Sequence, residues 1–298
     1  MHGPSAFEGG FRRFVELTLT LARTEFKLRY YGSVLGYVWS LMRPLLFFGV
    51  LYVFFTQILH VGQGIPHYGV YLLTGIVLWN YFLEATGMAV TCLVDREGLI
   101  RKIRFPRMVV PLSVSLTALF NLVMNLFAVL AFTLANGISP ALSWLWMLPI
   151  ILGFVFLASG VGMLLSALYV RFRDVKPIWD VLGQILFYAS PIMYIASKYH
   201  SLEHYAMLSP LAVMLTQMGH AFIHPARVAI SVGGHPAVVA GKVVTLGSHI
   251  VYTQEMPSAS HDAGGGLHVL ASILLIVFVF AFGLWVFTRE APRVAEHL

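Results

Sequence analysis

Long stretches of this sequence contain no Asp, Glu, Lys or Arg, and they limit the possible folds more than any other feature. They cover residues 44–83, 108–170, 181–197 and 263–288. A helix crosses the hydrocarbon core of a bilayer in roughly 20 apolar residues, and only helices and closed barrels satisfy their backbone groups there. We therefore predict an all-α polytopic membrane protein whose spans lie in these stretches.

The first two stretches are too long for one span each, and both contain a break near the middle. Gly, Pro, Asn and Ser residues mark these breaks at 60–66 and 136–140. The sequence then predicts six transmembrane helices, at about 35–58, 69–93, 108–134, 143–169, 177–197 and 267–288.

Composition excludes several classes of protein. Charged residues make up 11% of the chain and hydrophobic residues 58%, whereas a soluble domain carries about 25% charge, so a soluble enzyme is excluded. The 22 Phe, 13 Tyr and 6 Trp argue against disorder. The single cysteine, Cys92, excludes an internal disulfide and a four-cysteine metal site.

Lys and Arg residues predict the orientation in the membrane. They gather before the first span, after the second and fourth spans, and at the C-terminus, whereas the opposite connections hold only Lys198, Arg227 and Lys242. Because basic residues stay on the cytoplasmic side, we expect both termini of this inner-membrane protein in the cytoplasm. The net charge of +6 then reflects basic residues that set the orientation and contact lipid headgroups, and it does not indicate nucleic-acid binding.

Two segments outside the spans have distinct patterns. Residues 1–33 alternate apolar and charged side chains, which is typical of an amphipathic helix lying at the membrane interface or packed on the bundle. In the extracytoplasmic segment 198–266, the part up to about residue 224 is apolar enough to re-enter the membrane. Val, Ile and Gly at 228–252 favour a small β-hairpin.

Motifs for catalysis or cofactor binding are absent. The nearest approach to a Walker A motif, AGKV at 240–243, lacks the upstream Gly and the Ser or Thr. His200 with His204, and His220 with His224, have the i, i+4 spacing of metal ligands or of a pH sensor, but no complete ligand set accompanies them. We expect ordinary surface histidines, no metal, no cofactor and no catalytic residues in this chain.

Two charged residues fall well inside predicted spans, away from the ends of those spans. Arg43 and Glu84 lie at similar depths on antiparallel helices, about 12–14 Å from the cytoplasmic end. Charged residues inside a membrane usually form ion pairs or take part in transport. We therefore predict a buried Arg43–Glu84 ion pair whose main role is to hold the two helices together.

A polar stripe follows one face of the third predicted span. Ser113, Thr117, Asn121 and Asn125 are each four residues apart. Such a stripe either makes hydrogen bonds between helices or faces a channel. Aromatic faces are similarly ambiguous, since they stack on sugar rings and also fill cores.

Several motifs, in one order along the chain, resemble those of type-2 ABC export permeases of the polysaccharide, O-antigen and teichoic-acid export family. They are RYYGSVLGYVWSLMRP at 29–44, GIVLWNYF at 75–82, LIRKIRFPRMVVP at 99–111, RFRDV at 171–175, SPIMY at 190–194, LSPL at 208–211 and GLWVF at 283–287. The resemblance extends from about residue 11 to residue 298, and residues 226–266 are longer and more polar than the family requires.

The resemblance implies a permease, not an enzyme. Such chains pair as homodimers and bind two copies of a separate ATPase subunit, which carries the ATP and Mg²⁺. The substrate is a lipid-linked glycan of the O-antigen, capsule or teichoic-acid type, moved through a channel between the protomers. The implied division is an interface helix at 1–33, five spans at 34–197 with a coupling loop at 94–107, an outer gate and insertion at 198–266, and a last span and tail at 267–298.

The resemblance also implies roles for individual residues. The coupling loop would contact the ATPase through Asp95, Arg96, Leu99, Arg101, Lys102, Arg104, Phe105, Pro106 and Arg107. The channel would be lined by Tyr37, Trp39, Phe48, Tyr52, Phe55, Trp79, Tyr188 and Tyr194.

Three alternatives remain open. A permease for a small drug or lipid would have the same fold without a continuous aromatic lining. An ion-coupled transporter would show internal repeats and several midplane carboxylates, whereas Glu84 is the only candidate. A membrane glycosyltransferase would need acidic or metal-binding residues at a membrane face, where Asp95 and Glu97 are the only such pair and lie among five basic residues.

Overall fold

The structure is a computed structural model of the chain. It describes residues 10–30, 36–60, 67–102, 106–194, 207–223, 229–232, 235–238, 244–246, 249–251 and 266–290.

Five helical segments among the described residues are long and apolar enough to cross a membrane. They are α2 (Gly36–Val53) with its π-helical continuation η1 (Phe54–Ile58), α3 (Tyr68–Asp95), α5 (Val109–Ala135), α6 (Met147–Arg171) with the preceding 3-10 turn η2 (Leu142–Trp146), and α10 (Gly266–Glu290). Each coincides with one of the six predicted spans. The membrane-embedded part is therefore helical, as the charge-free stretches predict.

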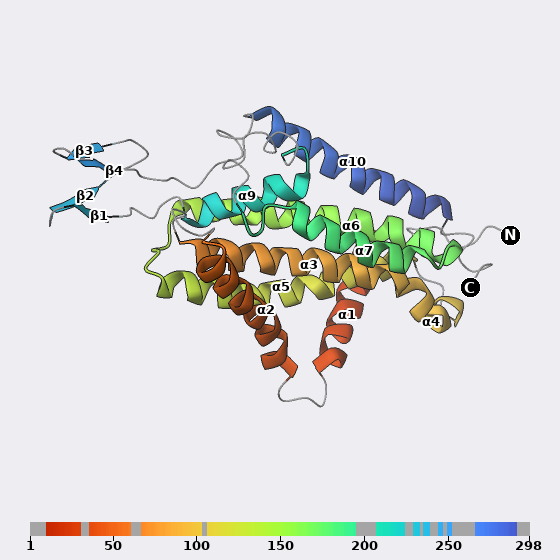
Figure 1. Cartoon of the computed structure of the whole chain (residues 1–298). Coiled ribbons are helices and arrows are strands. Elements are labelled where there is room, and N and C mark those ends of the chain that lie inside the picture. The colour runs from red at the N-terminus through yellow and green to blue at the C-terminus, as the bar shows by residue number, and fades with distance from the viewer. Residues whose placement is uncertain are drawn as a thin grey trace.

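Helix α3 is the centre of the bundle. It contacts α5, α6, α7 (Val175–Ala189) and α9 (Pro210–Ile223), and 67% of its apolar window is buried. The corresponding share is only 11% in α2 and in α10. Figure 1 shows α3 running through the bundle while α10 lies along one side and α2 on another.

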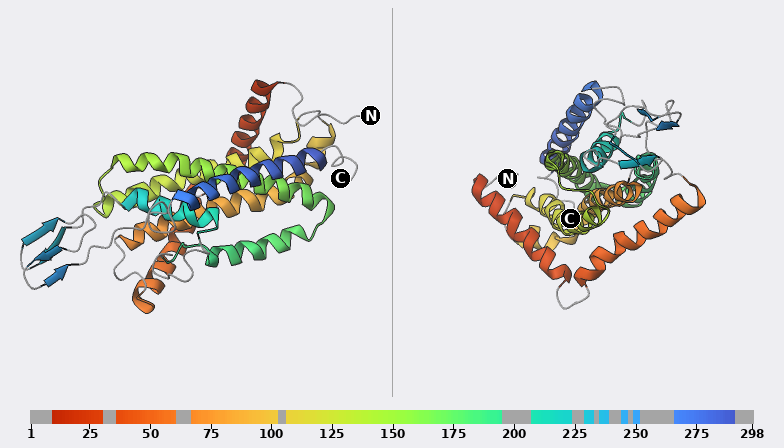
Figure 2. Two further views of the ribbon diagram at one scale, coloured as in Figure 1. Left: turned by 90° about the horizontal axis from the view of Figure 1, so that it is seen from above. Right: turned by 90° about the vertical axis from the view of Figure 1, so that its left-hand side faces the viewer.

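The first two helices diverge from the bundle. In the end-on view of Figure 2, α1 (Phe11–Tyr30) and α2 form the two arms of a V beside the other helices. Helix α1 packs mainly on α5, and α2 mainly on α3. The predicted N-terminal amphipathic segment is therefore a helix that packs against the bundle.

Helices α6 and α10 approach closely enough for backbone contact. A Cβ atom added to Gly283 would lie 2.1 Å from the carbonyl oxygen of Gly160, and one added to Gly160 would lie 2.7 Å from the Cα atom of Phe280. Small residues allow such close approach between membrane helices. The crossing of α6 and α10 therefore requires glycine on both helices.

The fifth predicted span differs most from the structure. Helix α7 ends at Ala189 rather than near residue 197, because the residue before a proline avoids the α conformation and Pro191 follows Ser190. Fifteen helical residues extend about 22 Å, which is less than the roughly 30 Å of the hydrocarbon core. Helix α7 alone does not make the sixth span.

The segment after α7 includes a buried helix and four short strands. Helix α9 contacts α3, α6, α10 and η2. Strands β1 (Ala229–Val232) and β2 (His235–Val238) form one antiparallel pair, and β3 (Val244–Leu246) and β4 (His249–Val251) form another. Figure 1 shows both pairs beyond one end of the bundle, with α4 (Glu97–Lys102) at the other end.

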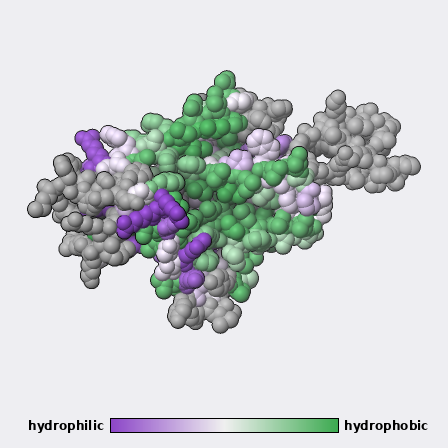
Figure 3. Space-filling view, turned by 180° about the vertical axis from the view of Figure 1, so that it is seen from behind, coloured by the Kyte–Doolittle hydropathy of each residue, from purple (hydrophilic) through white to green (hydrophobic). Residues whose placement is uncertain are grey.

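The outer surface of the bundle is broadly apolar. Figure 3 shows a nearly continuous hydrophobic surface over the helices, with the strongly hydrophilic residues gathered toward one side of the view. Large apolar side chains such as Val50, Phe127, Leu274 and Phe278 are exposed on the described helices. An apolar belt of this extent is what a bilayer requires of the helices that face it.

Candidate functional site

Helices α2 and α7 meet through one aromatic pair, and each carries an exposed aromatic side chain. The rings of Phe47 and Phe187 lie 5.9 Å apart between their centroids. Trp39 on α2 is 58% exposed and Tyr188 on α7 is 70% exposed. These two predicted channel residues therefore lie on surfaces that the chain itself does not cover.

Two other predicted channel residues are in the core. Phe48 contacts Phe132 of α5 edge to face, at 5.4 Å between centroids, and Trp79 lies against Phe82 and Phe187. Both side chains are buried. Within one chain, Phe48 and Trp79 thus fill the space between helices, and neither lies on an open surface.

The remaining predicted channel residues are exposed, half-buried or undescribed. Tyr52 is exposed and stacks on Tyr68 at 6.3 Å between centroids. Phe55 is half-buried in η1, and the Tyr194 hydroxyl donates to the carbonyl oxygen of Ala189 at 2.9 Å. The side chain of Tyr37 lies outside the described part of the chain.

A polar cluster joins α1, α3 and α5, with Glu84 at its centre. Arg29 of α1 donates to Oε1 of Glu84, and Asn121 of α5 donates to the same atom from Nδ2 at 2.7 Å. The Tyr30 hydroxyl donates to Oδ1 of Asn121, also at 2.7 Å. One carboxylate and one amide therefore connect three helices.

The predicted Arg43–Glu84 pair is not formed. Glu84 is bound by Arg29, while Arg43 is exposed on α2. Helix α2 does reach α3 at this depth, since Pro44 and Glu84 line one small cavity, but Arg43 lies on the exposed side of α2. The structure also packs α1 against α3 and α5, so that the basic partner comes from α1.

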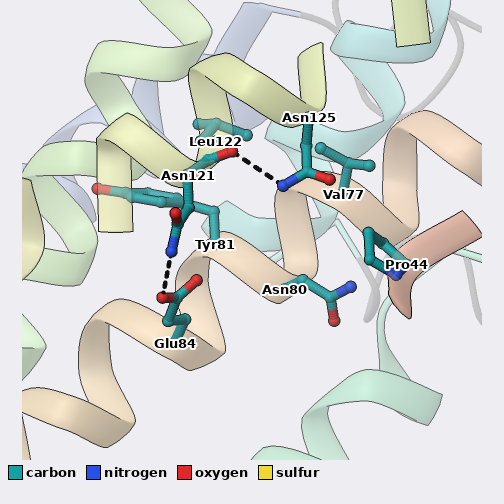
Figure 4. A pocket seen from close by; sticks show the side chains of 8 residues that line it. All are labelled: Pro44, Val77, Asn80, Tyr81, Glu84, Asn121, Leu122 and Asn125. Carbon is teal, nitrogen blue, oxygen red and sulfur yellow. Dashed lines mark hydrogen bonds between the residues drawn. The ribbon is translucent and has the colours of Figure 1, made fainter. Parts of the chain in front are cut away.

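A small cavity adjoins the polar cluster. It has a volume of about 20 Å³, and its lining includes Pro44, Asn80, Glu84 and Asn125. Figure 4 shows the Glu84 carboxylate and the amides of Asn80, Asn121 and Asn125 around it, contributed by α3 and α5. This volume suffices for about one water molecule, so the cavity is no substrate site.

The polar stripe of α5 makes hydrogen bonds between helices. Thr117 donates to the carbonyl oxygen of Ala22 on α1 at 3.3 Å, and Asn121 reaches α1 and α3. Asn125 donates to the carbonyl oxygen of Asn121 within α5. Ser113 and Thr117 are fully buried. Of the two interpretations of the stripe, the structure favours contact between helices over a channel face.

The basic connection between α3 and α5 begins with residues that bond within the chain. Asp95 accepts a hydrogen bond from the Thr91 hydroxyl at 2.7 Å. Arg96 pairs with Glu25 of α1 and donates to the carbonyl oxygen of Cys92. Arg96 thus fixes α1 to the end of α3, a role that the sequence did not suggest.

Other predicted coupling residues divide into buried and undescribed ones. Pro106 and Arg107 are buried, Nη1 of Arg107 has no hydrogen-bond partner, and burial lowers the pKa of this guanidinium. Leu99, Arg101 and Lys102 belong to α4, but their side chains lie outside the described part of the chain, as do residues Arg104 and Phe105 entirely.

The SPIMY turn at 190–194 is held by two tyrosines of α3 that the sequence reasoning missed. The Tyr68 hydroxyl donates to the carbonyl oxygen of Met193 at 2.8 Å, and the Tyr71 hydroxyl donates to the carbonyl oxygens of Pro191 and Tyr194. Both tyrosines are buried. The tyrosines at the start of a buried apolar span were the available signal, because a buried hydroxyl needs a partner.

No group of three or more potential metal ligands occurs among the described residues. Of the four histidines considered as ligands, His220 lies in α9, and His200, His204 and His224 lie outside the described residues. The described residues thus contribute no metal centre to the candidate site, which consists of the exposed aromatic residues of α2 and α7 and the polar cluster of α1, α3 and α5.

Comparisons with known proteins agree on one family. Residues 16–222 match the family model described as ABC-2 type transporter. The O-antigen export system permease protein RfbA of Klebsiella pneumoniae is 31% identical over 214 residues, which cover 70% of this chain and 81% of that protein. The protein of the same name from Myxococcus xanthus is 30% identical over 202 residues, covering 68% of this chain and 77% of that protein.

Proposed function

The chain belongs to the ABC-2 type transporter family, and from this we propose that it is the transmembrane subunit of an ATP-driven exporter of lipid-linked polysaccharide. The observation that carries the proposal is the similarity to O-antigen export permeases over more than two thirds of the chain. O-antigen, capsule and teichoic-acid chains are the substrate class, and this permease subunit performs no catalysis itself.

We propose that two copies of the chain form the channel between them. In one copy, α2 is little buried and carries exposed aromatic residues next to α7. A second copy facing this surface would enclose a path lined by Trp39, Tyr52 and Tyr188. Aromatic rings stack on the apolar faces of sugars, so this lining suits a passing glycan.

The ATPase subunits bind at the end of the bundle where α4 lies. The connection 94–107 is rich in basic residues, which favours docking on an acidic rim. Two ATPase copies, one for each protomer, supply the ATP and Mg²⁺. ATP drives transport only if its binding changes the relative stability of two conformations.

Helix α1 is the element through which this change reaches the spans. It bonds to the end of α3 through Glu25 and Arg96 and to the middle of the bundle through Arg29 and Glu84. A shift of the ATPase against α1 or α4 would therefore move α3. We further propose that α7 belongs to a sixth span and that both termini lie in the cytoplasm.

Binding of the ATPase tests the docking surface. We expect the double variant Arg101→Glu, Lys102→Glu to lose at least tenfold in affinity for the co-expressed ATPase subunit, because charge reversal opposes an acidic rim. The control Arg289→Glu reverses a charge at the end of α10 and should bind normally. Equal affinity in both variants would place the ATPase elsewhere.

Transport tests the substrate class. The complex is reconstituted in vesicles, and ATP-dependent movement of a polyprenyl-linked glycan is compared with that of the same lipid carrying one sugar. We expect Trp39→Ala and Tyr188→Ala to slow the glycan-bearing lipid severalfold while ATPase binding persists. Transport without any ATPase subunit would refute the proposed function.

A further inference from the structure

A second cavity, far larger than the one beside Glu84, lies between α6, α9 and α10. Its volume is about 600 Å³, within the range of about 300–1,000 Å³ that small-molecule sites occupy. Its lining is almost entirely apolar and includes Ile150, Phe156, Met214, Ile276 and Phe280. None of the predicted channel or coupling residues lines it.

The cavity opens toward the apolar surface of the bundle. Leu152 and Phe156 of α6 and Ile273 of α10 line it and are also about half exposed. These residues belong to two segments that are long and apolar enough to span the membrane. A hydrocarbon chain of the bilayer can therefore enter sideways, whereas a polar solute would first have to cross lipid.

The depth of the cavity corresponds to one leaflet. The lining extends from Trp146 of η2 to Phe156 of α6, and along α10 from Val269 to Phe280, which is about 15–17 Å in each case. Half of the hydrocarbon core is about 15 Å. Trp146 and Val269 lie near the ends of their segments that face away from α4, so the cavity belongs to the leaflet opposite the basic connection.

One polar group at the shallow end has no partner within the protein. Ser272 is 4% exposed, lines the cavity, and its Oγ atom makes no hydrogen bond. A buried hydroxyl without a hydrogen-bond partner destabilises a protein by roughly 1–3 kcal/mol. A hydrogen-bond acceptor at this depth would remove that cost. The ester carbonyl of a lipid lies at this level, at the edge of the hydrocarbon, and accepts hydrogen bonds.

We propose that this cavity is a binding site for one acyl chain of a phospholipid from the leaflet opposite α4. The chain lies between α6 and α10 down to Phe280, and its ester carbonyl accepts a hydrogen bond from Ser272. Because α9 forms the third wall through Val213 and Met214, the bound chain braces α9 against the two spanning helices. The site is separate from the proposed glycan path on α2 and α7.

Photolabelling tests the site. The full-length chain is reconstituted in nanodiscs with a phosphatidylethanolamine that carries a diazirine near the end of one acyl chain. After irradiation, labelled peptides are mapped by mass spectrometry. We expect labelling to concentrate on the cavity residues of α6, α9 and α10. Labelling spread evenly over exposed apolar residues such as Val50 and Phe127 would overturn the proposal.

Neighbouring residues of α10 provide the matched control. Ile273 lines the cavity and Leu274 does not, although they are exposed to a similar extent, at 52% and 60%. We expect Ile273→Trp to lower labelling of the cavity at least fivefold and Leu274→Trp to leave it unchanged. If Ile273→Trp fails to fold, Leu152→Trp fills the cavity from α6. Equal labelling in the filled and control variants would refute the site.

Lipid retention tests the role of Ser272. We expect Ser272→Ala to retain the lipid about fivefold less well through delipidation, as counted by native mass spectrometry, because one ordinary hydrogen bond is lost. Thr288→Ala is the control, since its hydroxyl donates within α10 and lies outside the cavity. Unchanged retention in Ser272→Ala would exclude the ester carbonyl as partner. These measurements need no ATPase subunit, so they can fail or succeed independently of the proposed function.

Discussion

Glu84 accepts hydrogen bonds from two other helices through one oxygen atom, since Arg29 and Asn121 both donate to Oε1. We predict that Glu84→Gln destabilises the protein by about 1–2 kcal/mol. Charged hydrogen bonds contribute about 1.5–3 kcal/mol, and partial exposure of the pair reduces this figure. Thermal unfolding in detergent measures the change.

An exposed pair on the same helix gives the control. Arg12 and Glu16 are bonded at 3.0 Å, but their side chains are 93% and 62% exposed. Glu16→Gln should therefore leave the melting temperature unchanged. A double-mutant cycle of Glu84→Gln with Arg29→Ala should show a coupling energy, and additive effects would mean that the pair does not form.

The polar face of α5 could be predicted correctly from the sequence. The four-residue spacing from Ser113 to Asn125 predicted one polar face of a helix, and the structure shows that face in contact with α1 and α3. The spacing could not show which basic residue forms an ion pair with Glu84. That partner depends on α1 returning to the bundle, which is a tertiary contact between residues 55 positions apart.

At the scale of helices, the crossing of α6 and α10 depends on Gly160 and Gly283. We predict that Gly283→Ala lowers the stability by at least about 2 kcal/mol, because the new methyl group would overlap the backbone carbonyl of Gly160 and force the helices apart. Chemical unfolding followed by Trp fluorescence measures this loss.

Gly49 of α2 serves as the matched glycine. A Cβ atom at this position meets nothing within 4 Å. We expect Gly49→Ala to be neutral or to stabilise by about 0.5–1 kcal/mol, since alanine is the better helix former. A similar loss in both variants would show that the crossing is not tightly packed.

Helix boundaries could be predicted where charge-free stretches and turn residues coincide, and five predicted spans match helices within a few residues. The prediction extended the helix at 177–197 too far, because it followed hydrophobicity through Ser190 and Pro191. Hydrophobicity shows what lipid tolerates, whereas the end of α7 is decided by backbone sterics and by the tyrosines of α3 that hold the following turn.

At the scale of the whole molecule, the lone cysteine makes the topology testable. Cys92 is buried, so Cys92→Ala gives a background for single new cysteines. We predict that an impermeant maleimide labels Gly98→Cys only from the cytoplasm and Ser139→Cys only from outside. Both positions are exposed and lie at opposite ends of the bundle. Labelling of both from one side would contradict the orientation predicted from Lys and Arg.

The unequal burial of the spanning helices affects which substitutions the sequence can accept during evolution. Helix α3 is enclosed like the interior of a soluble protein, whereas α2 and α10 are mostly uncovered in one chain. Where a side chain meets only lipid, exchange among Leu, Ile, Val and Phe costs little, but each position of α3 must also fit its neighbours in volume and shape. Among related proteins, the sequence of α3 should therefore change most slowly. The lipid-facing positions of α10 should exchange one hydrophobic residue for another often enough that little sequence identity remains there.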